Sequence, residues 1–113
     1  MKIAIPTRDG TLCAHFGHCE EFTFVDIDRD AKQIKGVQRV PAPPHEPGLL
    51  PRWLKERGAE VVIAGGMGTR ARTIFAESGI EVIVGAPQAR PEEVVQSYMD
   101  GTLELGDNVC DHT

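Results

Sequence analysis

Residues 59–84 decide the fold, and they read AEVVIAGGMGTRARTIFAESGIEVIV. The unbroken apolar runs at 59–64 and 81–84 are typical of strands that are covered on both faces of a sheet. Between them, a glycine-rich turn leads into a segment with apolar residues at helical spacing, which ends at Gly79. Such a strand–helix–strand unit predicts parallel strands joined by a right-handed crossover.

The sequence on either side extends this unit into an α/β domain. Gly36 interrupts the alternation of its strand and indicates an edge strand or a bulge, and Pro91 is placed to open the last helix. We expect further strands at residues 2–5 (closed by Pro6), 21–27 and 33–40, and further helices at residues 49–57 and from 91 onward. The result is a mixed sheet of about five strands, flanked by helices.

Length and composition place the chain among ordinary globular domains. It has 113 residues, of which 41% are hydrophobic and 26% charged, so we expect one domain at residues 1–105 and a tail at 106–113 that bears Cys and His. A net charge of -5 weighs against a nucleic-acid partner. No apolar stretch is long enough for a membrane span, and the start does not fit a signal peptide, so a cytoplasmic location is expected.

The segment from Cys13 to Cys19 reads CAHFGHC and carries four soft or borderline metal ligands within a long loop. Thiolates and imidazoles favour zinc, copper or iron–sulfur species over magnesium or calcium. The spacing lacks the Cys-x-x-Cys pair that is typical of a structural zinc site. The candidate metal ligands are Cys13, His15, His18 and Cys19, with Cys110 and His112 from the tail. The alternatives are that the cysteines are buried as small apolar residues and that the histidines form hydrogen bonds with the backbone.

Three loops follow strand ends that meet at one edge of the sheet if the first strand is parallel to the later two. They are the segments 7–19, 65–69 and 85–90, and open α/β sheets bind ligands at this carboxyl edge. The glycine-rich turn opens a helix, so its backbone amides are expected to hold an anion. The alternative is a tight turn that only allows close packing of the strand and the helix. A dinucleotide site is disfavoured because the next strand ends without the acidic residue that holds a ribose. The candidate cofactor-binding residues of this turn are Gly65, Gly66, Met67, Gly68 and Thr69.

Catalytic patterns are weak in this sequence. It has neither a nucleophile elbow nor a phosphate-binding Walker loop. Cys19 is next to His18, but adjacent residues on an extended segment point apart, so the pair gains little as an activated nucleophile. We therefore expect a binding protein and not an enzyme.

Several stretches together resemble the dinitrogenase iron–molybdenum cofactor biosynthesis family over nearly the whole chain. They are MKIAIPTRDG at 1–10, HFGHCEEF at 15–22, VVIAGGMGTRA at 61–71, GIEVIVGA at 79–86 and the tail. The resemblance implies an α/β domain with a ribonuclease-H-like motif and a five-stranded mixed sheet. It also implies non-covalent carriage or storage of an iron–sulfur or molybdenum-containing metal–sulfur cluster during cofactor assembly.

The family's His-Phe-Gly segment corresponds to His15, Phe16 and Gly17, which adds Phe16 and Gly17 to the candidate cofactor-binding residues. Cys13 departs from the family pattern, where a small hydroxylated residue is commoner, and so does the proline-rich insert with His45. The resemblance further implies cluster-assembly or acceptor proteins as partners, and a homodimer that shares one cluster is a possible loaded state. Two alternatives stay open: a metal-free regulatory or scaffolding domain that docks onto a cluster-assembly or ATPase partner, and a small redox protein using Cys13 and Cys19 as a dithiol.

Overall fold

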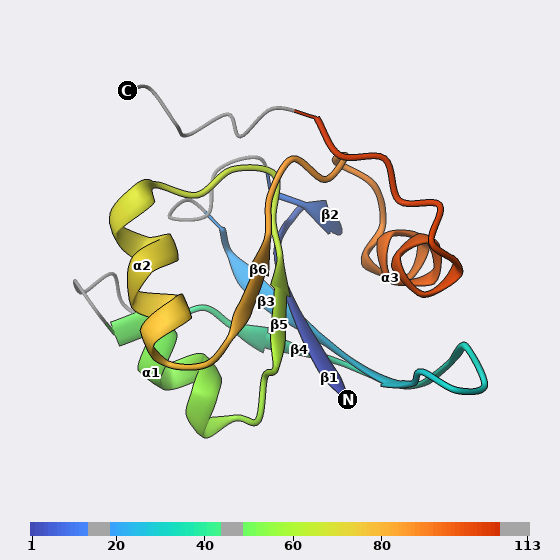
Figure 1. Cartoon of the computed structure of the whole chain (residues 1–113), viewed down its shortest axis with the longest axis horizontal. Helices are drawn as coiled ribbons and strands as arrows, with labels where there is room; N and C mark the ends of the chain where they lie inside the picture. Colours follow the sequence, from blue (N-terminus) through green and yellow to red (C-terminus); the bar gives the residue numbers. More distant parts are fainter. Residues whose placement is uncertain (14–18, 44–48, 107–113) are drawn as a thin grey trace.

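The computed structural model describes residues 1–13, 19–43 and 49–106, and it is a mixed α/β fold (Figure 1). The strands have the spatial order β4-β3-β1-β5-β6, with a short strand β2 paired to β1. The elements in chain order are β1 Lys2–Arg8, β2 Thr11–Leu12, β3 Glu21–Asp28, β4 Gln33–Pro41, α1 Leu49–Glu56, β5 Val61–Ile63, α2 Thr69–Glu77, β6 Glu81–Ile83 and α3 Pro91–Asp100. Within these residues, none of the helices is long and apolar enough to cross a membrane.

The parallel arrangement expected at the carboxyl edge is confirmed. β1 pairs in parallel with β5, and β5 pairs in parallel with β6. β3 and β4 form the expected antiparallel hairpin, and its register shifts opposite Asp26 and Ile27, so a bulge lies beside Gly36 as predicted. The ribonuclease-H-like part of the expectation stays a prediction.

Two expectations about the amino-terminal region were wrong. Among the described residues the sheet has six strands and not five, because an Asp9-Gly10 turn folds β2 back onto β1. Both turn residues have positive φ, 55° and 83°, which is the conformation that favours Asp-Gly in tight hairpins. Pro6 also does not close the first strand, since β1 runs through it to Arg8. The direct β1–β5 pairing involves Ile3 and Ala4, before the proline, so its missing N–H interrupts none of those pairs.

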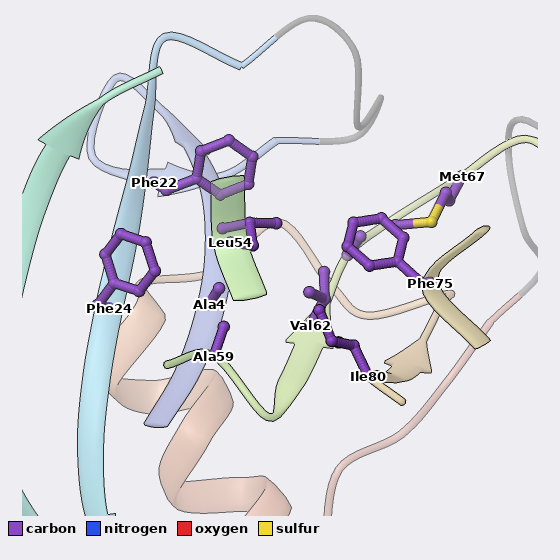
Figure 2. Close-up of a cluster of buried hydrophobic side chains, with 10 residues drawn as sticks. Ala4, Phe22, Phe24, Leu54, Ala59, Val62, Met67, Phe75 and Ile80 are labelled. Atoms are coloured by element: carbon purple, nitrogen blue, oxygen red, sulfur yellow. The ribbon is translucent and has the colours of Figure 1, made fainter. Parts of the chain in front are cut away.

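The sheet is covered on both faces, and each face has its own core. On one face α1 and α2 bury a cluster that includes Phe22, Leu54, Val62 and Phe75 (Figure 2). On the other face α3 packs Val94 and Val95 against Ile3, Ile5 and other sheet residues. Burial on both faces explains why β1 and β5 read as continuous apolar runs.

Candidate functional site

Cys13 and Cys19 are held at the carboxyl end of β1. The Cys13 N–H donates to the Pro6 carbonyl over 2.8 Å, and the Glu20 N–H donates to the Thr7 carbonyl over 3.0 Å. Cys13 is buried, and Cys19 is half-buried against the core that α1 and α2 cover. Hydrogen bonds to adjacent residues of β1 thus fix the two points where the chain leaves the sheet and returns to it.

The electrostatics of this pair keep Cys19 protonated. Burial, and secondly the negative charge that Cys13 would carry, raise the pKa of the Cys19 thiol from 9.0 to about 11. A backbone hydrogen bond opposes this increase only in part. Because a thiolate is the metal-binding form of cysteine, a metal bound here would have to displace the Cys19 proton.

The glycine-rich turn lies at the same edge, between β5 and α2 (Figure 1). Gly65 and Gly66 are buried, yet the N–H groups of Gly65, Gly66 and Gly68 donate no hydrogen bond to any residue that the structure describes. Buried backbone N–H groups are nearly always paired with protein, water or ligand. The two buried donors of Gly65 and Gly66, with the exposed donor of Gly68 beside them, are therefore suited to an acceptor from outside the protein.

Gly68 is not required by the fold. It is the N-cap of α2 with φ −65° and ψ 154°, a conformation that any residue adopts. A Cβ built on it would meet nothing within 4 Å. Ser, Thr, Asp and Asn are the favoured residues at such a position. Neither the backbone conformation nor the packing therefore requires glycine here. The missing side chain leaves space for a ligand to approach the helix start closely.

The start of α2 is also electrostatically unbalanced. Its first turn contains no acidic residue and no side chain caps it, while Arg70 and Arg72 nearby are exposed. The positive end of the helix dipole therefore lies close to two guanidinium groups. An anion bound at this turn would relieve that repulsion.

A ladder of backbone hydrogen bonds brings the start of the tail to this edge. The Gly85 N–H donates to the Gly65 carbonyl over 2.9 Å, and the Gly106 N–H donates to the Gly85 carbonyl over 2.7 Å. Gly85 has φ +86°, and a Cβ there would lie 2.1 Å from the Gly106 carbonyl oxygen. Only glycine therefore permits this crossing of the chain. The sequence predicted a loop at 85–90 but did not reveal this contact, because it joins segments about 20 residues apart.

The structure places some of the predicted site residues and leaves others outside its described ranges. Cys13, Cys19 and the turn Gly65–Thr69 lie at the carboxyl edge. The side chain of Met67 is fully buried in the core beside Phe75 (Figure 2), so its backbone is the part that could face a ligand. The remaining candidates lie outside the described residues: His15, Phe16, Gly17, His18, His45, Cys110 and His112. Within the described part, no three or more His, Cys, Asp or Glu side chains gather as a metal site.

An open groove of ≈ 540 Å³ lies between α2 and β6. It contains no thiol and shares only Thr69 with the candidate residues. Its lining residues are Thr69, Arg72, Thr73, Ala76, Ile80, Glu81 and Val82. The groove therefore adjoins the glycine-rich turn at Thr69, and neither Cys13 nor Cys19 lines it.

Comparison with known proteins identifies the family. The chain is similar to the crystal structure of PH0822, with 35% identity and a TM-score of 0.85 over 93% of this chain and 94% of that one. It is 28% identical to an uncharacterized protein of Methanocaldococcus jannaschii, over 92% of this chain and 90% of that protein. The apo form of the orange protein from Desulfovibrio gigas shares the fold, with a TM-score of 0.71, 24% identity and coverage of 95% and 93%.

The family model described as dinitrogenase iron-molybdenum cofactor matches residues 1–101. This range includes Cys13, Cys19, the glycine-rich turn and Gly85, and it ends before Gly106. The chain belongs to the dinitrogenase iron–molybdenum cofactor family.

Proposed function

We propose that this protein binds an anionic metal–sulfur cluster at the carboxyl edge of its sheet and carries or stores it during metallocofactor assembly. The cluster, of the iron–sulfur or molybdenum-containing class, is cargo and not a reactant, so we propose a carrier and not an enzyme. The observation that carries this proposal is the set of backbone donors at Gly65, Gly66 and Gly68 that have no acceptor among the described residues, at the start of a helix whose first turn has no acidic residue. Membership of the family supports the class of cargo.

In this proposal the two described cysteines and the glycine turn have different roles. Cys13 and Cys19 supply soft sulfur ligands, which suit iron, copper and molybdenum–sulfur species. The backbone N–H groups bind the terminal sulfides and neutralise part of the negative charge. Binding of a metal by Cys19 releases a proton, because the pKa of this thiol is about 11 when no metal is bound and the thiol is then protonated at neutral pH.

The tail is proposed to complete the site. Gly106, hydrogen-bonded to Gly85, places the beginning of the tail at the cargo-binding edge. Cys110 follows four residues later, a distance of at most about 14 Å along an extended chain. Together with His15, His18 and His112, it is a candidate further ligand. A homodimer that shares one cluster remains part of the proposal, as do acceptor proteins.

The test is anaerobic purification, followed by a visible spectrum and analysis for iron, molybdenum, copper, zinc and sulfide. The protein is then reconstituted in separate trials with iron and sulfide and with molybdate and sulfide. We expect colour and bound metal in one of these trials, and their loss in Cys13→Ser and Cys19→Ser. A protein that stays colourless and metal-free in every trial contradicts the carrier role. Colour that survives both substitutions contradicts the ligand assignment alone.

The second candidate is a metal-free domain that docks onto a cluster-assembly or ATPase partner. The observation that favours it is that the described residues bring together only two soft ligands and no group of three. It predicts that the wild-type chain binds a partner protein equally well before and after attempted reconstitution. A change in partner binding on loading would exclude it.

A further inference from the structure

The edge strand β4 is a second distinct surface, at the opposite side of the sheet from β6. The hairpin that it forms with β3 projects from the body of the molecule (Figure 1). Seven of the nine residues of β4 are exposed and the other two are only half-buried. An edge strand presents a row of backbone N–H and C=O groups to whatever lies beside it.

The side chains of this edge are basic in an otherwise acidic protein. Residues 31–43 carry Lys32, Lys35 and Arg39 and no acidic residue, whereas the whole chain has a net charge of -5. Neither Lys35 nor Arg39 forms an ion pair with any part of the chain that the structure describes. Val37 lies between them and is 45% exposed, one of two large hydrophobic side chains with such exposure among the described residues.

Val37 and Arg39 lie on one face of the hairpin. They pair with Val25 and Thr23 of β3, whose side chains are buried. Lys35 is in the bulge two residues before Val37. An extended segment added beside β4 would therefore meet an apolar contact with one positive charge on the same face, at Arg39, and a second positive charge at the bulge, from Lys35.

A second copy of the chain does not fit this edge. Two β4 strands paired antiparallel about Val37 would place Lys35 of one copy opposite Arg39 of the other. Like charges directly opposite one another destabilise a strand pair. The complementary occupant is a strand of another protein that carries carboxylates on either side of an apolar residue.

We propose that β4 is a docking strand for an extended acidic segment of a partner protein, with an acidic–x–apolar–x–acidic pattern. The partner strand adds to the sheet through backbone hydrogen bonds, and the pattern is read by Arg39, Val37 and Lys35. None of these three residues belongs to the cargo-binding edge, although β4 ends next to it, where the Ala42 N–H donates to the Glu20 carbonyl. The competing explanation is that Lys35 and Arg39 only prevent edge-to-edge aggregation, as charged residues on edge strands often do.

The experiment titrates the isotope-labelled full chain with a capped peptide TETVTET and follows backbone amide resonances. We expect shifts along residues 33–41, weaker binding at high salt, and no binding of TKTVTKT or of TETPTET, in which proline removes the central N–H. The double variant Lys35→Ser/Arg39→Ser should weaken binding about fivefold, since two exposed charge pairs are lost. The matched variant Arg52→Ser/Arg90→Ser loses the same charge from exposed helix-side positions and should bind as the wild type does.

Three results would overturn the proposal. The first is the absence of amide shifts along β4 at saturating peptide. The second is an equal loss of affinity in the two double variants, which would indicate attraction to net charge only. The third is self-association of Lys35→Ser/Arg39→Ser together with no peptide binding to the wild type, which would leave protection against aggregation as the role of these residues.

Discussion

Helices α2 and α3 both start at the carboxyl edge of the sheet, after β5 and β6 respectively, but their first turns differ in charge. α3 begins with Pro91 and carries Glu92 and Glu93, which balance the positive end of its dipole. α2 has no acidic residue in its first turn and has Arg70 there instead. In neither helix does the N-cap residue form a side-chain capping hydrogen bond. Of these two helices, α2 alone lacks an acidic residue that would balance its positive end, so an external anion could do so.

The largest effect is expected when an acidic residue is introduced at the N-cap of α2. Gly68→Asp should reduce cargo binding about a hundredfold or more, because a carboxylate some 4 Å from an anion costs about 4 kcal/mol at an effective dielectric constant of 20. The same change should raise the stability of the apo protein by a few tenths of a kcal/mol, since Asp caps better than Gly. Metal analysis and thermal unfolding measure the two effects.

Arg90→Asp is the control at the other helix start, because Arg90 is the N-cap of α3. It changes the net charge by two and not by one, so it overstates any effect of net charge alone. It should add a cap without affecting cargo binding. Equal loss of binding in both variants would show that the two helix starts do not differ in function.

The next effect concerns the crossing of Gly106 over Gly85. Gly85→Ala should destabilise the protein by about 2–3 kcal/mol, through its positive φ and the clash with the Gly106 carbonyl. Gly101→Ala has a positive φ of 74° but no atom within 4 Å of the new Cβ, so it should cost about 1 kcal/mol. Chemical unfolding of both variants measures the difference, and equal values would contradict the close contact.

A smaller effect is expected from charge changes in the first turns. Arg70→Glu should stabilise the apo protein by about 0.3–1 kcal/mol, while Glu92→Lys should destabilise it by a similar amount. Unfolding at low and high salt measures both changes, which screening should reduce. If Arg70→Glu stabilises the protein and also weakens cargo binding, the positive helix start serves the cargo and not the fold.

The last prediction concerns the pH dependence of Cys19, an effect that is confined to alkaline pH. The positive start of α2 does not ionise this thiol, since burial and Cys13 raise its pKa to about 11. A folded pKa above the ordinary value of 9.0 contributes stability that is complete below pH 9 and is lost as the pH rises through 11. In Cys13→Ser the pKa of Cys19 should fall, although burial keeps it above 9.0. The rate of iodoacetamide alkylation against pH measures this titration, and a midpoint at 9.0 in the wild type would contradict it.

The sequence predicted the parts of the fold whose signal is local. The apolar run of β5, the glycine end of α2 at Gly79 and the proline start of α3 were all confirmed. β2 was not predicted, because its residues lie in a segment without helical or strand periodicity that was assigned to a loop. Asp9-Gly10 is nevertheless a recognisable hairpin turn. Pro6 was predicted to end the first strand. It lies beyond the residues of β1 that pair with β5, so its missing N–H interrupts none of these pairs.

By itself, the sequence determined that parallel strands and a glycine-rich turn would meet at one edge, because periodicity and turn residues are properties of neighbouring positions. It also determined the soft ligands that this edge could offer. Only the tertiary structure decided that Gly68 has no packing role, that three backbone donors lack a described acceptor, and that Gly85 lies against Gly106. These facts depend on which distant segments come into contact. Hydrogen-bond partners and close approaches across about 20 residues are set by the packed sheet and leave no local pattern in the chain.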